Sequence, residues 1–190
     1  MDIKLRDIEI KDLNDYLYWN HPQREFHKFN GPYFKKETEK ELQLRVINLQ
    51  SRLEKEEINV LGNKKIIANA KNNEIIGEVN WYWKSKETDW LEVGIVIFNE
   101  NYWGSGIGYK ALRTWIDMVF NIFPQIKRIG FTTWSGNQRM INLGEKLKLK
   151  KEAVYRNARV VENKYYDSVS YGILKDEWYN INYEQNEIEH

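Results

Sequence analysis

Two periodicities of apolar residues alternate along this chain. Seven stretches either alternate apolar with polar residues or are rich in Val and Ile, and both patterns are typical of β-strands. They cover residues 3–10, 60–70, 75–83, 89–98, 127–134, 153–161 and 164–174. Four other stretches carry apolar residues three or four positions apart, which predicts amphipathic helices. They cover residues 12–20, 38–55, 109–123 and 138–147.

The order of these elements, β-α-α-β-β-β-α-β-α-β-β, indicates the fold class. Strands and helices interleave without a strict βαβ repeat, so we expect an α/β chain (mixed α+β) with one mixed sheet and helices on both faces. A length of 190 residues suits one domain, which we place at residues 1–178. Residues 179–190 are polar, and we expect this C-terminal tail to fray.

Composition excludes several classes of chemistry. The chain has no cysteine, which rules out disulfides, thiolate nucleophiles and cysteine metal sites. Three histidines, His21, His27 and His190, leave little for a zinc centre or a Ser-His-Asp triad, so we expect no metal. Lys and Arg number 29 against 28 for Asp and Glu, so no bulk positive charge favours nucleic acid.

The uninterrupted apolar stretches are short. Those such as residues 95–98 fall far below the roughly 20 residues that span a bilayer. The first residues alternate charged and apolar side chains and lack the apolar core of a signal peptide. We therefore expect a cytoplasmic protein that does not bind membranes.

The strongest chemical signal is the junction between the strand at 89–98 and the helix that follows. Glycines stand at positions 104, 106 and 108 of this turn. Glycines let consecutive backbone N–H groups converge, and a helix N-terminus adds about half a positive charge, so a diphosphate fits such a turn. The Walker order is absent, and a dinucleotide fingerprint belongs in an earlier βαβ unit. Taken alone, the turn is equally consistent with phosphate binding and with a plain strand-to-helix junction.

The same segment resembles the acyl-CoA-binding motif of the GNAT N-acetyltransferase superfamily, Gln/Arg-x-x-Gly-x-Gly/Ala, at residues 103–108. The form Tyr-Trp-Gly-x-Gly-Ile-Gly is similar to the branch that contains the ribosomal-protein N-terminal acetyltransferases. Similarity continues at 133–140, 145–149 and 165–174, so the resemblance covers roughly residues 60–178 well. It implies a GNAT fold, with a mostly antiparallel mixed sheet of about six to seven strands.

The resemblance implies acetyl-CoA as the co-substrate. Backbone groups of Val96, Ile97 and Phe98 would face the pantetheine arm. Asn137 would hydrogen-bond the same arm where two neighbouring strands separate. The turn that would hold the pyrophosphate through its backbone amides consists of Trp103, Gly104, Ser105, Gly106, Ile107 and Gly108. Trp103 replaces the Gln or Arg of the general motif, so one side-chain contact to phosphate is missing.

Glu92, on the strand before the turn, is the candidate general base, because several members of the superfamily carry a catalytic glutamate there. The alternative is a structural carboxylate paired with Arg or Lys on the next strand. The usual general acid is a tyrosine seven residues after the asparagine, and that position is Gly144 here. Tyr166, Tyr171 or solvent would have to protonate the thiolate instead.

The implied activity is direct transfer of an acetyl group to a primary amine in a ternary complex. A peptide or protein N-terminal amine is the first hypothesis: with a pKa of about 7.7–8.0, roughly a tenth is already neutral at pH 7, unlike lysine near 10.4. Two alternatives stay open. One is a small-molecule (polyamine or aminoglycoside) acceptor, which an acidic cleft would favour; the other is a non-catalytic acyl-CoA-binding sensor. A homodimer is compatible with these residues.

Overall fold

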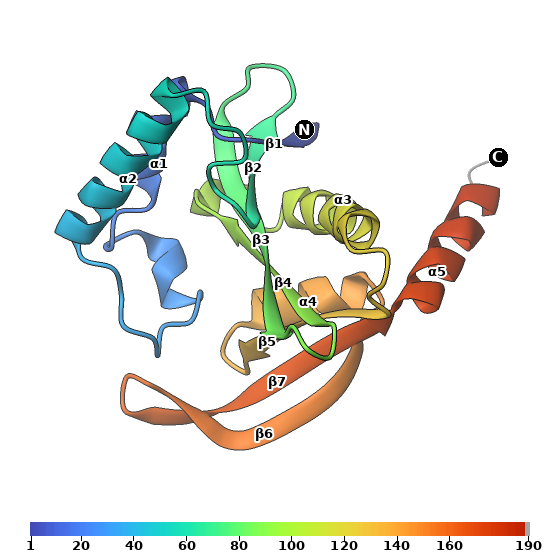
Figure 1. Ribbon diagram of the computed structural model, residues 1–190. Helices are drawn as coiled ribbons and strands as arrows, with labels where there is room; N and C mark the ends of the chain where they lie inside the picture. Colours follow the sequence, from blue (N-terminus) through green and yellow to red (C-terminus); the bar gives the residue numbers. More distant parts are fainter. Residues whose placement is uncertain (189–190) are drawn as a thin grey trace. The chain divides into compact units, whose positions relative to one another are not determined.

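The computed structural model of the chain describes the backbone of residues 1–188 and the side chains of residues 1–181 (Figure 1). Internal contacts divide it into two compact units. The first comprises Met1–Asn80 and Gly94–Trp115, and the second comprises Trp81–Val93 and the chain from Ile116 onward. The last two positions of the predicted tail, residues 189 and 190, lie outside the described residues. His190 is one of them.

Seven strands of the described chain form one mixed sheet in the order β1-β2-β3-β4-β5-β7-β6. Their bounds are β1 Ile3–Arg6, β2 Lys64–Asn69, β3 Ile75–Ser85, β4 Trp90–Ile97, β5 Arg128–Trp134, β6 Lys150–Val161 and β7 Lys164–Leu174. β4 and β5 are parallel, whereas β1 with β2, β2 with β3, β5 with β7, and β6 with β7 are antiparallel. The predicted mixed, mostly antiparallel sheet is confirmed.

Five α-helices accompany the sheet in the described residues. They are α1 Leu13–Trp19, α2 Glu39–Glu54, α3 Ile107–Ile122, α4 Gln138–Lys146 and α5 Lys175–Ile188, with short 3-10 turns at Ile10–Asp12, Glu25–Lys28 and Glu100–Tyr102. The helices predicted at 38–55 and 138–147 are confirmed to within one residue at each end. None of the helices in the described part of the chain is long and apolar enough to cross a membrane.

The first strand is shorter than the alternation predicts and ends at Arg6. The Arg6 guanidinium donates to both carboxylate oxygens of Asp12, at 2.5 and 2.9 Å, and to the side-chain oxygen of Asn73, at 2.8 Å. Asp12 is only 4% exposed. This buried ion pair turns the chain away from the sheet, so residues 7–10 do not pair with β2.

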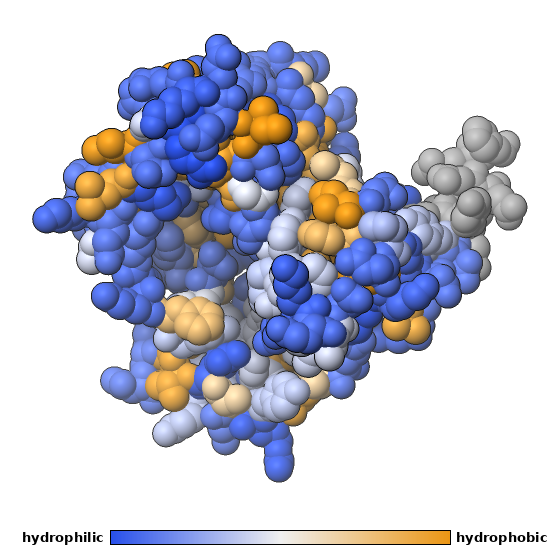
Figure 2. Space-filling model, viewed as in Figure 1, coloured by the Kyte–Doolittle hydropathy of each residue, from blue (hydrophilic) through white to orange (hydrophobic). Residues whose placement is uncertain are grey.

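In the first unit, α1 and α2 cover one face of the sheet. Tyr16 and Leu42 share a buried cluster with Ile66 and Ala68, which are alternate residues of β2 and so point to the same face. The opposite side of α2 faces solvent. Figure 2 shows that the surface over α2 is mostly hydrophilic, with some apolar groups among the polar ones.

In the second unit, α5 extends through Ile188, into the segment that the sequence predicts to fray. Asp176 and Glu177 lie in its first turn, where acidic residues complement the helix dipole. Trp178 is 2% exposed, and its indole N–H donates to Asp117 at 2.6 Å. This anchor joins residues 61 positions apart, which is why local periodicity did not predict the helix.

The N-terminal cap of α2 gives a test of local stability. The Thr38 hydroxyl accepts the backbone N–H of Glu41, and the Glu41 carboxylate accepts that of Thr38, which together form a capping box. Thr38→Ala should lower the free energy of unfolding by about 0.5–2 kcal/mol, measured by urea denaturation. Thr38→Ser keeps the hydroxyl and should stay close to the unchanged protein; equal losses in the two variants would contradict the role of the cap.

Candidate active site

The turn between β4 and α3 lies in the first unit. Gly104 and Gly106 have φ values of +76° and +86°, a region that favours glycine, and a Cβ at either would meet nothing within 4 Å. Glycine is therefore required by backbone conformation and not by crowding. The first N–H groups of α3, a helix of 16 residues, follow directly. They have no acceptor within the helix, so an anion such as a pyrophosphate suits this turn.

The end of β4 enters the same turn. The N–H of Phe98 donates to the carbonyl of Ile76 on β3 at 2.9 Å. The indole N–H of Trp103 donates to the carbonyl of Ile97 at 2.9 Å, and its ring packs edge-on against Phe29. Trp103 thus joins the turn to the strand by a hydrogen bond. The general motif has a polar side chain at the Trp103 position. The Ile97 carbonyl, predicted to face pantetheine, already has a donor in the described structure.

Glu92 lies in the second unit and is 1% exposed. The Tyr82 hydroxyl donates to one of its carboxylate oxygens at 2.5 Å, and the Thr132 hydroxyl donates to the other at 2.8 Å. Thr132 in turn lies 3.0 Å from the Ser170 hydroxyl. Sequence reasoning missed these hydroxyl partners, because strand alternation gives the face of a residue but not its neighbour on another strand.

The alternative of a Glu92 salt bridge to the neighbouring strand is not what the structure holds. Arg128, the nearby cation on β5, pairs with Glu152, its Nε lying 3.0 Å from the carboxylate. The strand position directly facing Glu92 on β5 is Gly130, which carries no side chain. Glu92 is therefore a buried carboxylate held by neutral hydroxyl donors.

Asn137 also lies in the second unit, at the start of α4. Its side-chain oxygen accepts the backbone N–H of Met140 at 3.3 Å, so the residue caps the helix. The structure thus places Glu92 and Asn137 in one unit, and the strand end 96–98 with the glycine turn in the other.

The position of the usual general acid has no room for a tyrosine. A Cβ on Gly144 would lie 2.5 Å from the Phe131 ring. Of the two substitutes, Tyr171 is 1% exposed, donates to Glu145 at 3.0 Å, and has its pKa raised by burial. Tyr166 packs edge-on against Trp134. Burial makes Tyr171 a poor donor to a leaving thiolate.

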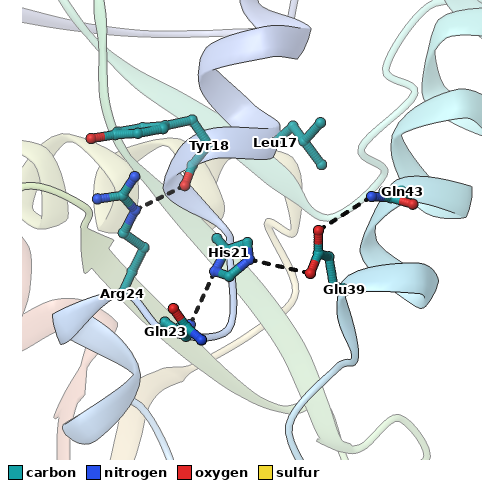
Figure 3. A pocket seen from close by; sticks show the side chains of 7 residues that line it. All are labelled: Leu17, Tyr18, His21, Gln23, Arg24, Glu39 and Gln43. Atoms are coloured by element: carbon teal, nitrogen blue, oxygen red, sulfur yellow. Dashed lines mark hydrogen bonds and ion pairs between the residues drawn. The ribbon is translucent and has the colours of Figure 1, made fainter.

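A cavity of about 520 Å³ lies in the first unit. Figure 3 shows the side chains that line it. It is lined by Leu17, Tyr18, His21, Gln23, Arg24, Glu39 and Gln43. His21 lies 3.6 Å from the Glu39 carboxylate, and the Arg24 guanidinium lies over the Tyr18 ring at 3.4 Å. The charged groups of this cavity are therefore paired with each other or with an aromatic ring.

The two described histidines, His21 and His27, both lie in the first unit. His27 contacts the carbonyl of Asn20 at 3.3 Å, and burial lowers its pKa, which favours the neutral ring. Among the described residues, no group of three or more His, Asp or Glu side chains is arranged to hold a metal ion.

Comparison with known families identifies the chain. The family model described as an acetyltransferase (GNAT) domain matches residues 2–150. The chain therefore belongs to the GNAT acetyltransferase family, and it is an acetyl-CoA-dependent N-acetyltransferase. No curated relative matches the chain.

Solved structures share its fold, and two of them show the extent of the likeness. One is the crystal structure of a GNAT-family acetyltransferase from Bacillus anthracis, with a TM-score of 0.72, 19% identity, and coverage of 93% of this chain and 97% of that one. The other is spermidine N-acetyltransferase from Vibrio cholerae in complex with CoA and spermine, with a TM-score of 0.70, 17% identity and the same coverage. Identities this low show the fold alone.

The glycine turn can be tested through the affinity for acetyl-CoA. Gly106→Ala places a side chain at φ +86°, a strain of about 1–3 kcal/mol that rotates the neighbouring amides. We expect the Kd for acetyl-CoA, measured by calorimetry, to rise about tenfold or more. Gly62→Ala is the matched control, since Gly62 has φ +66°, equally open surroundings and a position outside the turn. A similar loss of affinity in both variants would show that the turn has no special part in binding.

Proposed function

We propose that the chain acetylates the α-amine of a peptide or protein N-terminus, as the ribosomal-protein N-terminal acetyltransferases do. In this proposal the amides of residues 103–108 hold the pyrophosphate, and the end of β4 together with Asn137 holds the pantetheine arm. Glu92 accepts the proton of the amine, through its hydroxyl partners or a water. The amine nitrogen then attacks the thioester carbonyl, and the carbon–sulfur bond breaks.

The choice of a peptide acceptor rests on the numbers of cations and carboxylates that line the cavities. A second cavity of about 520 Å³, in the second unit, has Lys127 and Arg128 in its lining, matched by Asp89 and Glu152. The cavity of Figure 3 contains one arginine and one glutamate. A polyamine or aminoglycoside carries several positive charges and needs an excess of carboxylates. Neither lining has that excess, which favours an acceptor with one amine and few other charges.

A third cavity of the first unit supports the same choice. Its charged residues are Arg45, Arg52 and Lys64 against Glu37, so cations outnumber carboxylates. Each of these cations already pairs with a carboxylate, Arg45 with Glu37, Arg52 with Glu57 and Lys64 with Glu78. This lining too therefore lacks the excess of carboxylates that a polycation needs.

Small-molecule acetylation is the second candidate. Its support is the likeness in fold to the Vibrio cholerae enzyme, whose structure holds CoA and spermine. Because many GNAT-like folds host different acceptors, that likeness argues for the reaction more strongly than for the substrate.

The acceptor is tested by release of CoA thiol from acetyl-CoA with three sets of amines: peptides with free N-termini, polyamines and aminoglycosides. We expect turnover with peptides, and N-terminally acetylated copies of the same peptides should be inactive. Turnover with polyamines and none with peptides would replace the first candidate by the second.

The proposed base is tested by Glu92→Gln, which keeps the shape and removes the basic oxygen. We expect kcat to fall about 100-fold or more, since general bases contribute roughly 10²–10⁴. The affinity for acetyl-CoA should not change. Tyr82→Phe and Thr132→Val each remove one hydroxyl donor and should cost about 3- to 10-fold in kcat. Unchanged kcat in the Glu92 variant would exclude it as the base.

A further inference from the structure

Asn80 on β3 carries a buried polar atom that the fold does not satisfy. Its side-chain oxygen Oδ1 is buried and has no hydrogen-bond partner in the described part of the chain. Buried side-chain oxygens in folded proteins almost always have a donor, and leaving one unpaired costs about 1–3 kcal/mol. Such an atom requires a donor that the described side chains and backbone do not supply.

The neighbouring polar group on the same strand is fully paired, which makes Asn80 an exception. Glu78, two residues earlier on the same face, accepts the Tyr16 hydroxyl at 3.1 Å and the Lys64 ammonium at 2.6 Å. The strand therefore does not lack donors in general. The missing partner is specific to Asn80.

The Asn80 side chain packs directly against Gly94 on β4. A Cβ at position 94 would lie 2.7 Å from Oδ1, so only glycine avoids a clash with the amide. Asn80 as a whole is half-buried.

Gly94 faces Asn80, and its position on β4 indicates where Asn80 lies relative to the acetyl group of the proposed co-substrate. In the proposed function the pyrophosphate lies at the turn and the arm runs back along Val96–Phe98, so the acetyl end lies toward Gly94. Gly94 and Val96 are two residues apart, about 6.6–6.8 Å along the strand, and share one face. Glu92 lies two residues further on that face.

We propose that Oδ1 of Asn80 accepts a hydrogen bond from the acceptor amine and so orients its lone pair toward the thioester carbonyl. This inference rests on the proposed function. A neutral primary amine has two N–H groups and one lone pair. Fixing one N–H on Asn80 leaves the lone pair to form the new C–N bond as the C–S bond breaks. The amine loses one proton, and the departing sulfur gains one.

The donor could instead be an amide N–H of the pantetheine arm, and the two sources predict different measurements. An amine donor affects KM for the acceptor and kcat, while the affinity for acetyl-CoA stays constant. A pantetheine donor affects the Kd for acetyl-CoA measured without any acceptor.

The test uses Asn80→Leu, which keeps the size and removes the amide. We expect kcat/KM for the acceptor amine to fall about 10- to 100-fold, with the calorimetric Kd for acetyl-CoA within twofold. Gly94→Ala pushes a methyl group against the same oxygen and should give the same pattern. Trp115→Phe is the control for strand position, because its indole bonds the backbone carbonyl of Asn80 at 2.8 Å and not the side chain. It should keep the acceptor KM.

Asn80→Asp gives a signature that a structural role would not. The carboxylate keeps an acceptor oxygen in place, so KM for the amine should stay low. Its charge favours the protonated amine, so kcat should fall and the rate optimum should move to higher pH.

Three results would overturn the inference: an unchanged kcat/KM in Asn80→Leu, a weakened acetyl-CoA Kd in that variant, or an equal loss in the Trp115 control. Unchanged kcat/KM in a chain that still transfers acetyl groups refutes only the role of Asn80. Absence of transfer to any amine by the unchanged protein refutes the proposed function itself.

Discussion

The register between β3 and β4 is the constraint on which the candidate site depends. Its facing pairs are Ile76 with Phe98, Asn80 with Gly94, and Tyr82 with Glu92. In each pair the residue numbers have the same sum, so one antiparallel register accounts for all three. Gly77 is required for this register, because a Cβ at that position would lie 2.1 Å from the carbonyl oxygen of Val96. A slip by one residue would turn every one of these side chains to the other face.

The same register separates two buried carboxylates with different partners. Glu78 is held by an ammonium group and a phenol, and Glu92 by two hydroxyls. Glu78 therefore holds α1 against the sheet through Tyr16, and Glu92 is the carboxylate proposed above as the base.

The sequence predicted what local patterns determine, and it missed what depends on distant partners. The glycine turn, the helix at 38–55 and the position of Glu92 on a strand all follow from short-range spacing. The early end of β1 depends on the Arg6–Asp12 ion pair, and α5 on the burial of Trp178. Hydroxyl partners of Glu92 likewise required the strand order, which periodicity does not give. Asn80 is not among the residues predicted from the sequence, because an isolated asparagine on a strand belongs to no recognisable motif.

The absence of a tyrosine at position 144 fits the proton balance of the reaction. A thiol with a pKa near that of free cysteine, about 8.5, leaves as a thiolate with moderate ease at neutral pH, so an acid accelerates the reaction less than a base does. The amine must lose a proton before it reacts, whereas the thiolate can take one from solvent afterwards. In the proposed function Glu92 is the group whose proton transfer precedes bond formation, and it is present, whereas the Phe131 ring fills the space beside Gly144 where the acid would stand.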